Sequence, residues 1–204
     1  MVSLLHRTGA LLLVVGAMAL TGCSTTAPTA QRVDAHATVA PLLALPVQAL
    51  PCSVALQQRL TVTPPQQSAQ SLEALLEVDA HTLKLALFHM GQRMGKLQWD
   101  GQQLHTELSR WWPSVLPPAQ VLSDLQLALW PMDAIQAALP AAWQVEENHS
   151  FRRLLYQREV RILVEKTNAD ALEIVYAPGT SNSWRLRIES PGGAQPCAAQ
   201  THTG

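Results

Sequence analysis

The sequence predicts an α+β protein made mainly of antiparallel β-strands, a curved half-barrel sheet with two short central helices as a lid over an apolar cavity. Apolar and polar residues alternate with a period of two on both sides of the middle of the chain. This alternation is typical of strands that bury one face. Apolar residues recur at helical spacing only in the middle. A sheet with this many strands is expected to curve, because open edges attract other strands.

Five strands are expected before the middle of the chain. Alternation marks the segments 54–62, 72–78, 83–87 and 97–99, and a short fifth strand contains Leu104. Gly91 and Gly95 bracket a turn, and Asp100-Gly101 is a strong hairpin signal. The segment 41–51 is apolar but contains three prolines, so we expect it to be extended rather than helical.

Two short helices and three further strands complete the expected fold. The apolar positions of the helices are Val121, Leu122, Leu125 and Leu129 in the first and Met132, Ile135, Ala138 and Leu139 in the second. Pro131 separates the helices, and Ser123 and Asp124 are expected on the exposed side. Alternation then returns in the segments 160–165, 172–176 and 184–189, each with one charged face.

Composition limits the class of protein. The chain has 204 residues, about one domain, and is 48% hydrophobic but only 14% charged. It is therefore too apolar for a disordered protein. The formal net charge of −1 lacks the basic excess typical of a nucleic-acid-binding protein, so we expect no nucleic-acid partner.

Residues 1–22 have the features of a secretory leader. One arginine precedes an apolar run at residues 10–20, which is too short to span a bilayer as a helix. The run ends in Leu20-Thr21-Gly22-Cys23, which resembles the lipobox of bacterial lipoproteins. That resemblance implies a lipid on Cys23, and Ser24 favours an outer-membrane location facing the periplasm. The alternative is an ordinary secretory signal with a chance cysteine.

The rest of the chain divides into three expected parts. Residues 23–50 are expected to be a lipidated N-terminus and flexible tether, 51–198 a folded domain, and 199–204 a flexible tail. Cys52 and Cys197 bracket the folded domain. In an oxidising compartment an even pair of cysteines indicates a disulfide. Two unrelated free thiols are the alternative.

From Leu56 to Ser190, the order of elements resembles the LolA/LolB group of lipoprotein carriers. These carriers are open half-barrels with a helical lid over an acyl-binding cavity. The stretch Leu122–Pro131 also looks like an uncharacterised lipoprotein family often encoded among genes for aryl-polyene and related pigment lipids, which shares the run Asp-x-x-Leu-x-x-Trp-Pro. Both resemblances imply a lipid-handling role without established catalysis.

The half-barrel expectation assigns two sets of site residues. The cavity and lid residues are Leu85, Leu87, Leu97, Leu122, Leu125, Leu129, Ile135, Ile162 and Ile174. The expected membrane-contact residues are Phe88, Met90, Trp111 and Trp112. Met90-Gly91 is similar to a pair in LolB whose apolar residue helps to deliver cargo to the membrane. The alternatives are that Met90 packs on the sheet edge and that the tryptophans belong to the core.

No motif for catalysis, metal or cofactor binding is present. The histidines lack HExxH spacing, no serine lies in a GxSxG turn, and His89 stands in a turn where a solvated role is expected. We therefore expect a lipid carrier, not an enzyme, with no cofactor and no metal. Its expected partners are the membrane, a lipid or lipid-linked cargo and a periplasmic carrier as donor. The alternatives are a structural lipoprotein that binds a protein and an acyl-processing enzyme.

Overall fold

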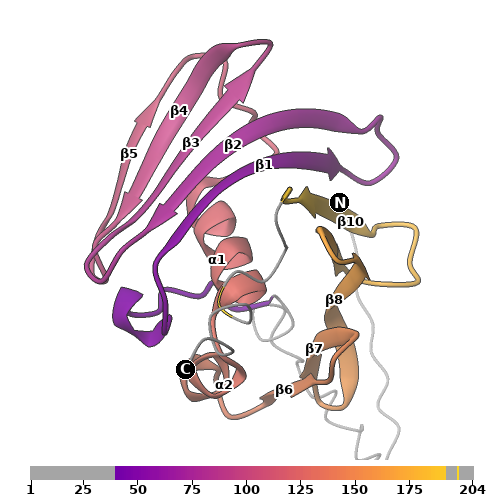
Figure 1. Cartoon of the computed structure of the whole chain (residues 1–204). Coiled ribbons are helices and arrows are strands. Elements are labelled where there is room, and N and C mark those ends of the chain that lie inside the picture. The colour runs from indigo at the N-terminus through magenta and orange to yellow at the C-terminus, as the bar shows by residue number, and fades with distance from the viewer. Residues whose placement is uncertain (1–39, 192–196, 198–204) are drawn as a thin grey trace, which may run out of the picture. The chain divides into compact units, whose positions relative to one another are not determined.

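The structure is a computed structural model that describes residues 40–191 and Cys197 (Figure 1). The expected leader 1–22, the lipidation residue Cys23 and the expected tail 199–204 lie outside the described residues. Within the described ranges, no helix is both long enough and apolar enough to cross a membrane.

Ten strands form one antiparallel sheet. Five precede the helices: β1 (Val54–Thr63), β2 (Gln70–Val78), β3 (Leu83–His89), β4 (Gln92–Trp99) and β5 (Leu104–Leu108). The helices are α1 (Pro118–Leu129) and α2 (Met132–Ala138), and a short 3-10 turn, η2, covers Val47–Ala49. Five strands follow: β6 (Trp143–Glu147), β7 (Phe151–Tyr156), β8 (Glu159–Asn168), β9 (Ala171–Tyr176) and β10 (Trp184–Glu189).

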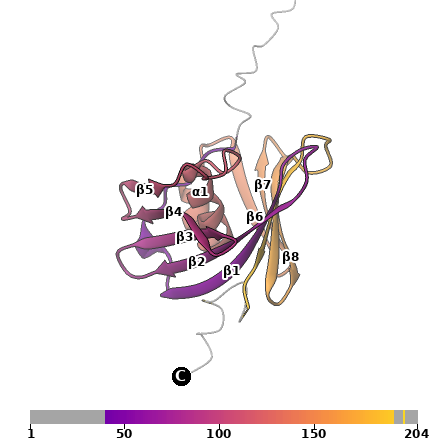
Figure 2. The same cartoon turned by 90° about the horizontal axis from the view of Figure 1, so that it is seen from above.

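The first and last strands meet in the middle of the sheet. The strand order is β5-β4-β3-β2-β1-β10-β9-β8-β7-β6, so each half is a simple meander and the β1–β10 pairing joins them. Seen from above, the sheet bends and α1 lies within the bend (Figure 2). The sheet is open, since β5 and β6 do not pair with each other. The predicted α+β class with a curved, open antiparallel sheet is therefore confirmed.

The first five strands and both helices were expected, but β6 and β7 were not. Strand β6 is an edge strand with only two buried residues, so its alternation is weak. In β7 three consecutive residues, Leu154 to Tyr156, are buried, because the register shifts between Leu154 and Leu155. A bulge of this kind removes the period-two pattern from the sequence.

Gly95 was expected to border a turn but lies inside β4. A Cβ atom at this position would lie 2.7 Å from Cε3 of Trp112, which is too close for any other residue. The glycine therefore allows the Trp112 ring to lie directly on the strand. The turn itself is shorter than expected and consists of Met90 and Gly91.

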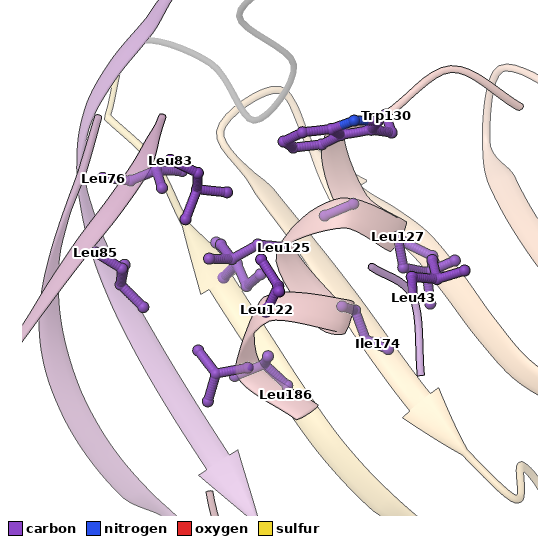
Figure 3. Packing of buried hydrophobic residues seen from close by; sticks show 14 of the residues in the cluster. Leu43, Leu76, Leu83, Leu85, Leu122, Leu125, Leu127, Trp130, Ile174 and Leu186 are labelled. Atoms are coloured by element: carbon purple, nitrogen blue, oxygen red, sulfur yellow. The ribbon is translucent and has the colours of Figure 1, made fainter. Parts of the chain in front are cut away.

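The core lies between α1 and the inner face of both halves of the sheet. Figure 3 shows Leu122 and Leu125 of α1 between leucines of β2 and β3 and Leu186 of β10. Eight of the nine predicted cavity and lid residues are buried in this cluster, and Leu129 packs against it half-buried. The helix thus covers the sheet as predicted, but its side chains fill the space where the sequence predicted a cavity.

The last ten residues of the expected tether belong to the folded domain. Leu43, Leu45 and Val47 are at most 3% exposed. The backbone N–H of Leu43 donates to Ser123 Oγ at 3.0 Å, and that of Leu45 donates to Gln126 Oε1 at 2.9 Å. The segment is extended up to the 3-10 turn, as its prolines predict. Residues 41–50 therefore belong to the folded domain, which was expected to start at 51.

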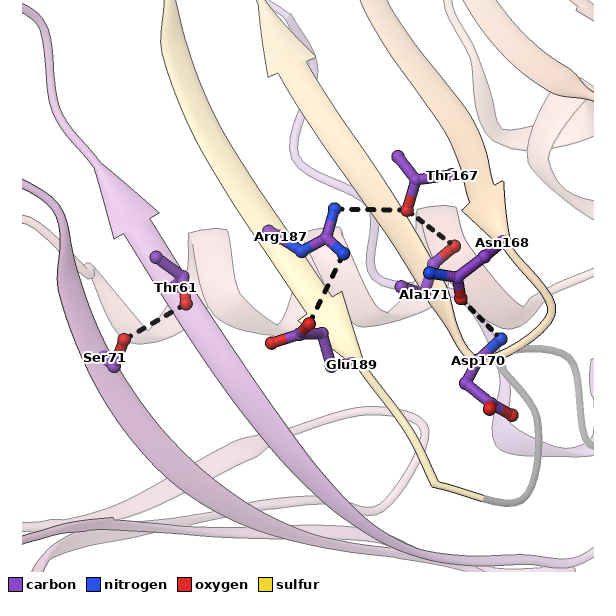
Figure 4. A network of polar contacts seen from close by, with 8 residues as sticks. All are labelled: Thr61, Ser71, Thr167, Asn168, Asp170, Ala171, Arg187 and Glu189. Atoms are coloured by element: carbon purple, nitrogen blue, oxygen red, sulfur yellow. Dashed lines mark hydrogen bonds and ion pairs between the residues drawn. The ribbon is translucent and has the colours of Figure 1, made fainter.

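The outer face of the sheet is polar. Figure 4 shows Arg187 of β10 donating to Thr167 Oγ1 at 3.2 Å and to Glu189 Oε1 at 3.3 Å. On the neighbouring strands, the hydroxyls of Thr61 and Ser71 lie 3.1 Å apart. Such exposed pairs contribute little to stability, but they keep this face solvated while the other face forms the core.

Cys52 and Cys197 form a disulfide, with Cα atoms 5.7 Å apart and a sequence separation of 145. The predicted pairing is confirmed, and it ties the segment before β1 to the segment after β10. A cross-link across so long a loop restricts the unfolded chain strongly.

Peptide mapping of the unreduced protein should find this pair linked. Digestion without reductant should release the peptides that contain Cys52 and Cys197 as one linked species, and reduction should separate them. Alkylation of both cysteines in unreduced, unfolded protein would show that the bond is absent.

Candidate functional site

A groove of about 810 Å³ opens at one end of the first half of the sheet. Its volume falls within the range typical of small-molecule sites. Its lining residues are Ala69, Gln70, Ser71, Leu72, His89, Met90, Gln92, Met94, Trp111 and Pro113. They come from the start of β2, the β3–β4 hairpin and the loop between β5 and α1, three segments that the fold brings together at this end.

The β3–β4 hairpin forms one lip of the groove. Met90 and Gly91 both have positive φ angles, 49° and 75°, as the central residues of the tight two-residue turns that suit twisted hairpins do. Such a position favours Asn or Gly, yet Met90 occupies it and is 90% exposed. The alternative that Met90 packs on the sheet edge is therefore wrong.

The loop before α1 forms the other lip. Trp111 is 62% exposed, and the guanidinium of Arg110 lies 4.6 Å from its ring centroid. Trp112 turns the other way and packs on Gly95, and its Nε1 donates to the Leu116 carbonyl at 2.7 Å. Of the two adjacent tryptophans, one thus belongs to the core and the other faces the groove.

The predicted site residues lie in three places: the groove, a neighbouring hollow and the core. Met90 and Trp111 line the groove, whereas Phe88 is half-buried in a smaller hollow of about 310 Å³ beside the same hairpin. None of the nine predicted cavity and lid residues lines the groove. Sequence reasoning missed Leu72 and Met94, because both follow the ordinary alternation of strands. His89 also lines the groove, although only a solvated turn residue was expected at this position.

A cluster of polar side chains, separate from the groove, lies between α1 and β9. Asp124, expected to be exposed, is only 1% exposed. Its Oδ1 accepts hydrogen bonds from Gln120 Nε2, at 2.9 Å, and from the Tyr176 hydroxyl of β9. Its Oδ2 is buried without a hydrogen-bond partner in the part of the chain that the structure describes. Ser123, also expected to be exposed, is buried against the segment at Leu43.

Burial dominates the acid–base properties of this cluster. It raises the pKa of Asp124 to about 7, although the hydrogen bonds from Tyr176 and Gln120 act in the opposite direction. Burial and the neighbouring Asp124 carboxylate raise the pKa of Tyr176 well above its ordinary value. None of these three residues lines the groove, so the cluster fastens α1 to β9 rather than facing a ligand.

The described residues contain no group of three or more His, Cys, Asp or Glu side chains placed to hold a metal ion. The fold and the groove define the arrangement of this chain: an open antiparallel sheet bent around one helix, with a mainly apolar groove at one end of its first half.

The chain belongs to the DUF3261 family, described as a protein of unknown function (DUF3261), whose pattern matches residues 55–191. No curated protein matches the chain. The matched region runs from the second residue of β1 to just beyond β10 and contains the whole groove. The buried segment 41–50 lies before it.

Proposed function

We propose that this protein is an outer-membrane lipoprotein, similar in action to the LolB carriers, that binds the apolar chain of a lipid or lipid-linked molecule and passes it to the membrane. The observation that carries the proposal is the groove with exposed apolar side chains, Met90 and Trp111, on its two lips. The lipobox-like run that ends in Cys23 supports attachment to a membrane.

The apolar lining supports binding of an acyl chain. Each methylene group that leaves water contributes about 0.8 kcal/mol, and Leu72, Met94 and Pro113 offer an apolar surface to such a chain. Methionine is flexible and polarizable, so it adapts to chains of different shape. A periplasmic carrier would supply the lipid. Transfer would follow the difference in affinity between groove and bilayer, without a catalytic residue.

Met90 supports delivery at the membrane surface. Because its backbone conformation favours Asn or Gly and its side chain is 90% exposed, neither the turn nor the core explains a methionine here. Trp111 lies on the opposite lip, and tryptophan rings favour the membrane interface. Together they would allow the groove to meet the bilayer with its open end.

Filling the groove should abolish lipid binding. Ala69 is an exposed residue of its lining, so Ala69→Trp should place a large ring in the groove without disturbing the core. Mass spectrometry of lipid that copurifies with the full chain should find lipid with the unmodified protein and little with this variant. Ala80→Trp is the matched control, because Ala80 is exposed in the turn after β2. Equal lipid in both variants would contradict binding in the groove.

A charge on the exposed lip should block delivery but not binding. With Met90→Glu we expect at least a several-fold slower transfer of bound lipid to vesicles, because an ionised carboxylate is costly to bring into an apolar phase. The thermal midpoint and the amount of bound lipid should stay unchanged. Met132→Glu on α2, a site 36% exposed, serves as control. Normal transfer by a folded Met90→Glu protein would reject the role of this residue.

A structural lipoprotein that binds a protein partner is a second candidate function. The observation that favours it is the interior, where the predicted cavity residues pack on one another. The copurification experiment separates the two functions, because a protein that carries no lipid in its unmodified form would have no cargo to deliver.

A further inference from the structure

The groove has one polar wall. Gln70 opens β2, while His89 and Gln92 are cross-strand partners beside the β3–β4 turn. His89 Nδ1 lies 3.2 Å from the backbone carbonyl of Ser71, which leaves Nε2 to face a ligand. Within residues 40–191, the amides of Gln70 and Gln92 take part in no hydrogen bond. The wall thus presents two amides, each of which can donate and accept, and one imidazole nitrogen that accepts while the ring is neutral.

This wall carries no Asp, Glu, Lys or Arg, and neither does the rest of the lining. The hydroxyl of Ser71 is engaged with Thr61 Oγ1 at 3.1 Å. Arg110 precedes the lining residue Trp111, and its guanidinium lies over the Trp111 ring at 4.6 Å. Arg93 follows Gln92 in β4 and pairs with Phe88, which lies outside the groove lining. A phosphate or carboxylate that entered here would lose water without gaining a fixed counter-charge, which is unfavourable.

Amides match a different kind of head group. A hydroxyl both donates and accepts a hydrogen bond, as a glutamine amide does, so a head group with several hydroxyls can satisfy both amides at once. Trp111 provides a flat ring that is apolar on its face and tolerates water at its edge. Leu72 and Met94 leave an apolar surface for a hydrocarbon chain next to these groups.

We propose that the groove recognises an amphiphile with an uncharged, hydroxyl-rich head group, such as a sugar, joined to an apolar chain. The hydroxyls bond to Gln70, His89 and Gln92, and the chain lies along Leu72 and Met94. This inference rests on the proposed lipid-binding function and adds the class of head group.

Two probes with the same decyl chain test the head group. Decyl maltoside has an uncharged sugar head, and decyl phosphate has an anionic one. Both are titrated below their micelle concentrations into the full chain, with isothermal titration calorimetry as the readout. We expect the maltoside to bind about tenfold more tightly, since its hydroxyls can donate to and accept from the polar wall, whereas the phosphate can only accept and finds no counter-charge in the lining.

Variants of the wall test the assignment of residues. The double variant Gln70→Leu with Gln92→Leu should lose about tenfold in affinity for the maltoside and much less for the phosphate. Both glutamines are exposed, so the fold should be unaffected, and circular dichroism checks this. The matched control is Gln57→Leu with Gln144→Leu, two exposed glutamines of β1 and β6 outside the groove.

The outcomes separate this inference from the proposed function. Equal or tighter binding of decyl phosphate, lost in Arg110→Ala, would overturn the uncharged head group and leave lipid binding intact. Unchanged maltoside affinity in the wall variant would overturn the role of the glutamines. Binding of neither probe would overturn this inference together with the proposed function.

Discussion

Replacing Leu125 by Asp should prevent the chain from folding. Leu125 lies on α1, is 3% exposed, and belongs to the core between the two halves of the sheet. Removing a buried leucine side chain costs about 2–5 kcal/mol, and an ionised carboxylate left without a partner in the core costs several kcal/mol more. The sum approaches the total stability of an ordinary domain, about 5–15 kcal/mol.

Circular dichroism and a thermal melt measure this effect. The variant should lose its cooperative transition, while the control Leu42→Asp should melt close to the unmodified protein, because Leu42 is 53% exposed. A cooperative melt of Leu125→Asp at the original temperature would mean that α1 does not lie in the core.

The free energy of unfolding should fall as the pH rises from about 5 to about 8. Burial raises the pKa of Asp124 to about 7 in the folded protein, from 3.8 in an ordinary environment. Between these values the folded state holds one proton more than the unfolded state, so raising the pH favours unfolding until the folded group has ionised. We expect a loss of about 2–3 kcal/mol over this window.

Asp124→Asn should remove this pH dependence, because the amide keeps the shape of the carboxyl group but cannot ionise. Urea unfolding at several pH values between about 5 and 8 provides the measurement. Asp133→Asn, a change at an exposed position of α2, should keep the original slope. A slope that survives Asp124→Asn would place its origin in another group.

The run Asp-x-x-Leu-x-x-Trp-Pro, visible in the sequence, is explained by packing. Asp124 holds β9 through Tyr176, and Leu127 is 1% exposed in the core. Trp130 is fully buried, and its Nε1 donates to the Pro46 carbonyl at 3.0 Å. Pro131 is the N-cap residue of α2 and separates the two helices. Asp124 and Trp130 bond to other parts of the fold and Leu127 packs in the core, so the motif identifies the architecture rather than a ligand site.

Local periodicity predicted eight of the ten strands and the apolar positions of α1, because each depends on neighbours in sequence. It could not reveal that Ser123 and Gln126 are buried, since their partners, Leu43 and Leu45, lie about 80 residues away. The groove could not be predicted from the sequence either, because its lining residues come from segments that are distant in sequence. Its lips, Met90 and Trp111, were each singled out from local sequence, but only the fold brings them to one opening.

The pairing of β1 with β10 has a consequence for biogenesis. Each meander can form from neighbouring hairpins as the chain emerges, but β1 has no second partner until nearly the last residue of the domain has been delivered. Contacts so distant in sequence form slowly, and an unpaired strand edge is prone to aggregate meanwhile. A chain truncated before residue 184 should therefore depend on chaperones, because its central strand would remain an open edge.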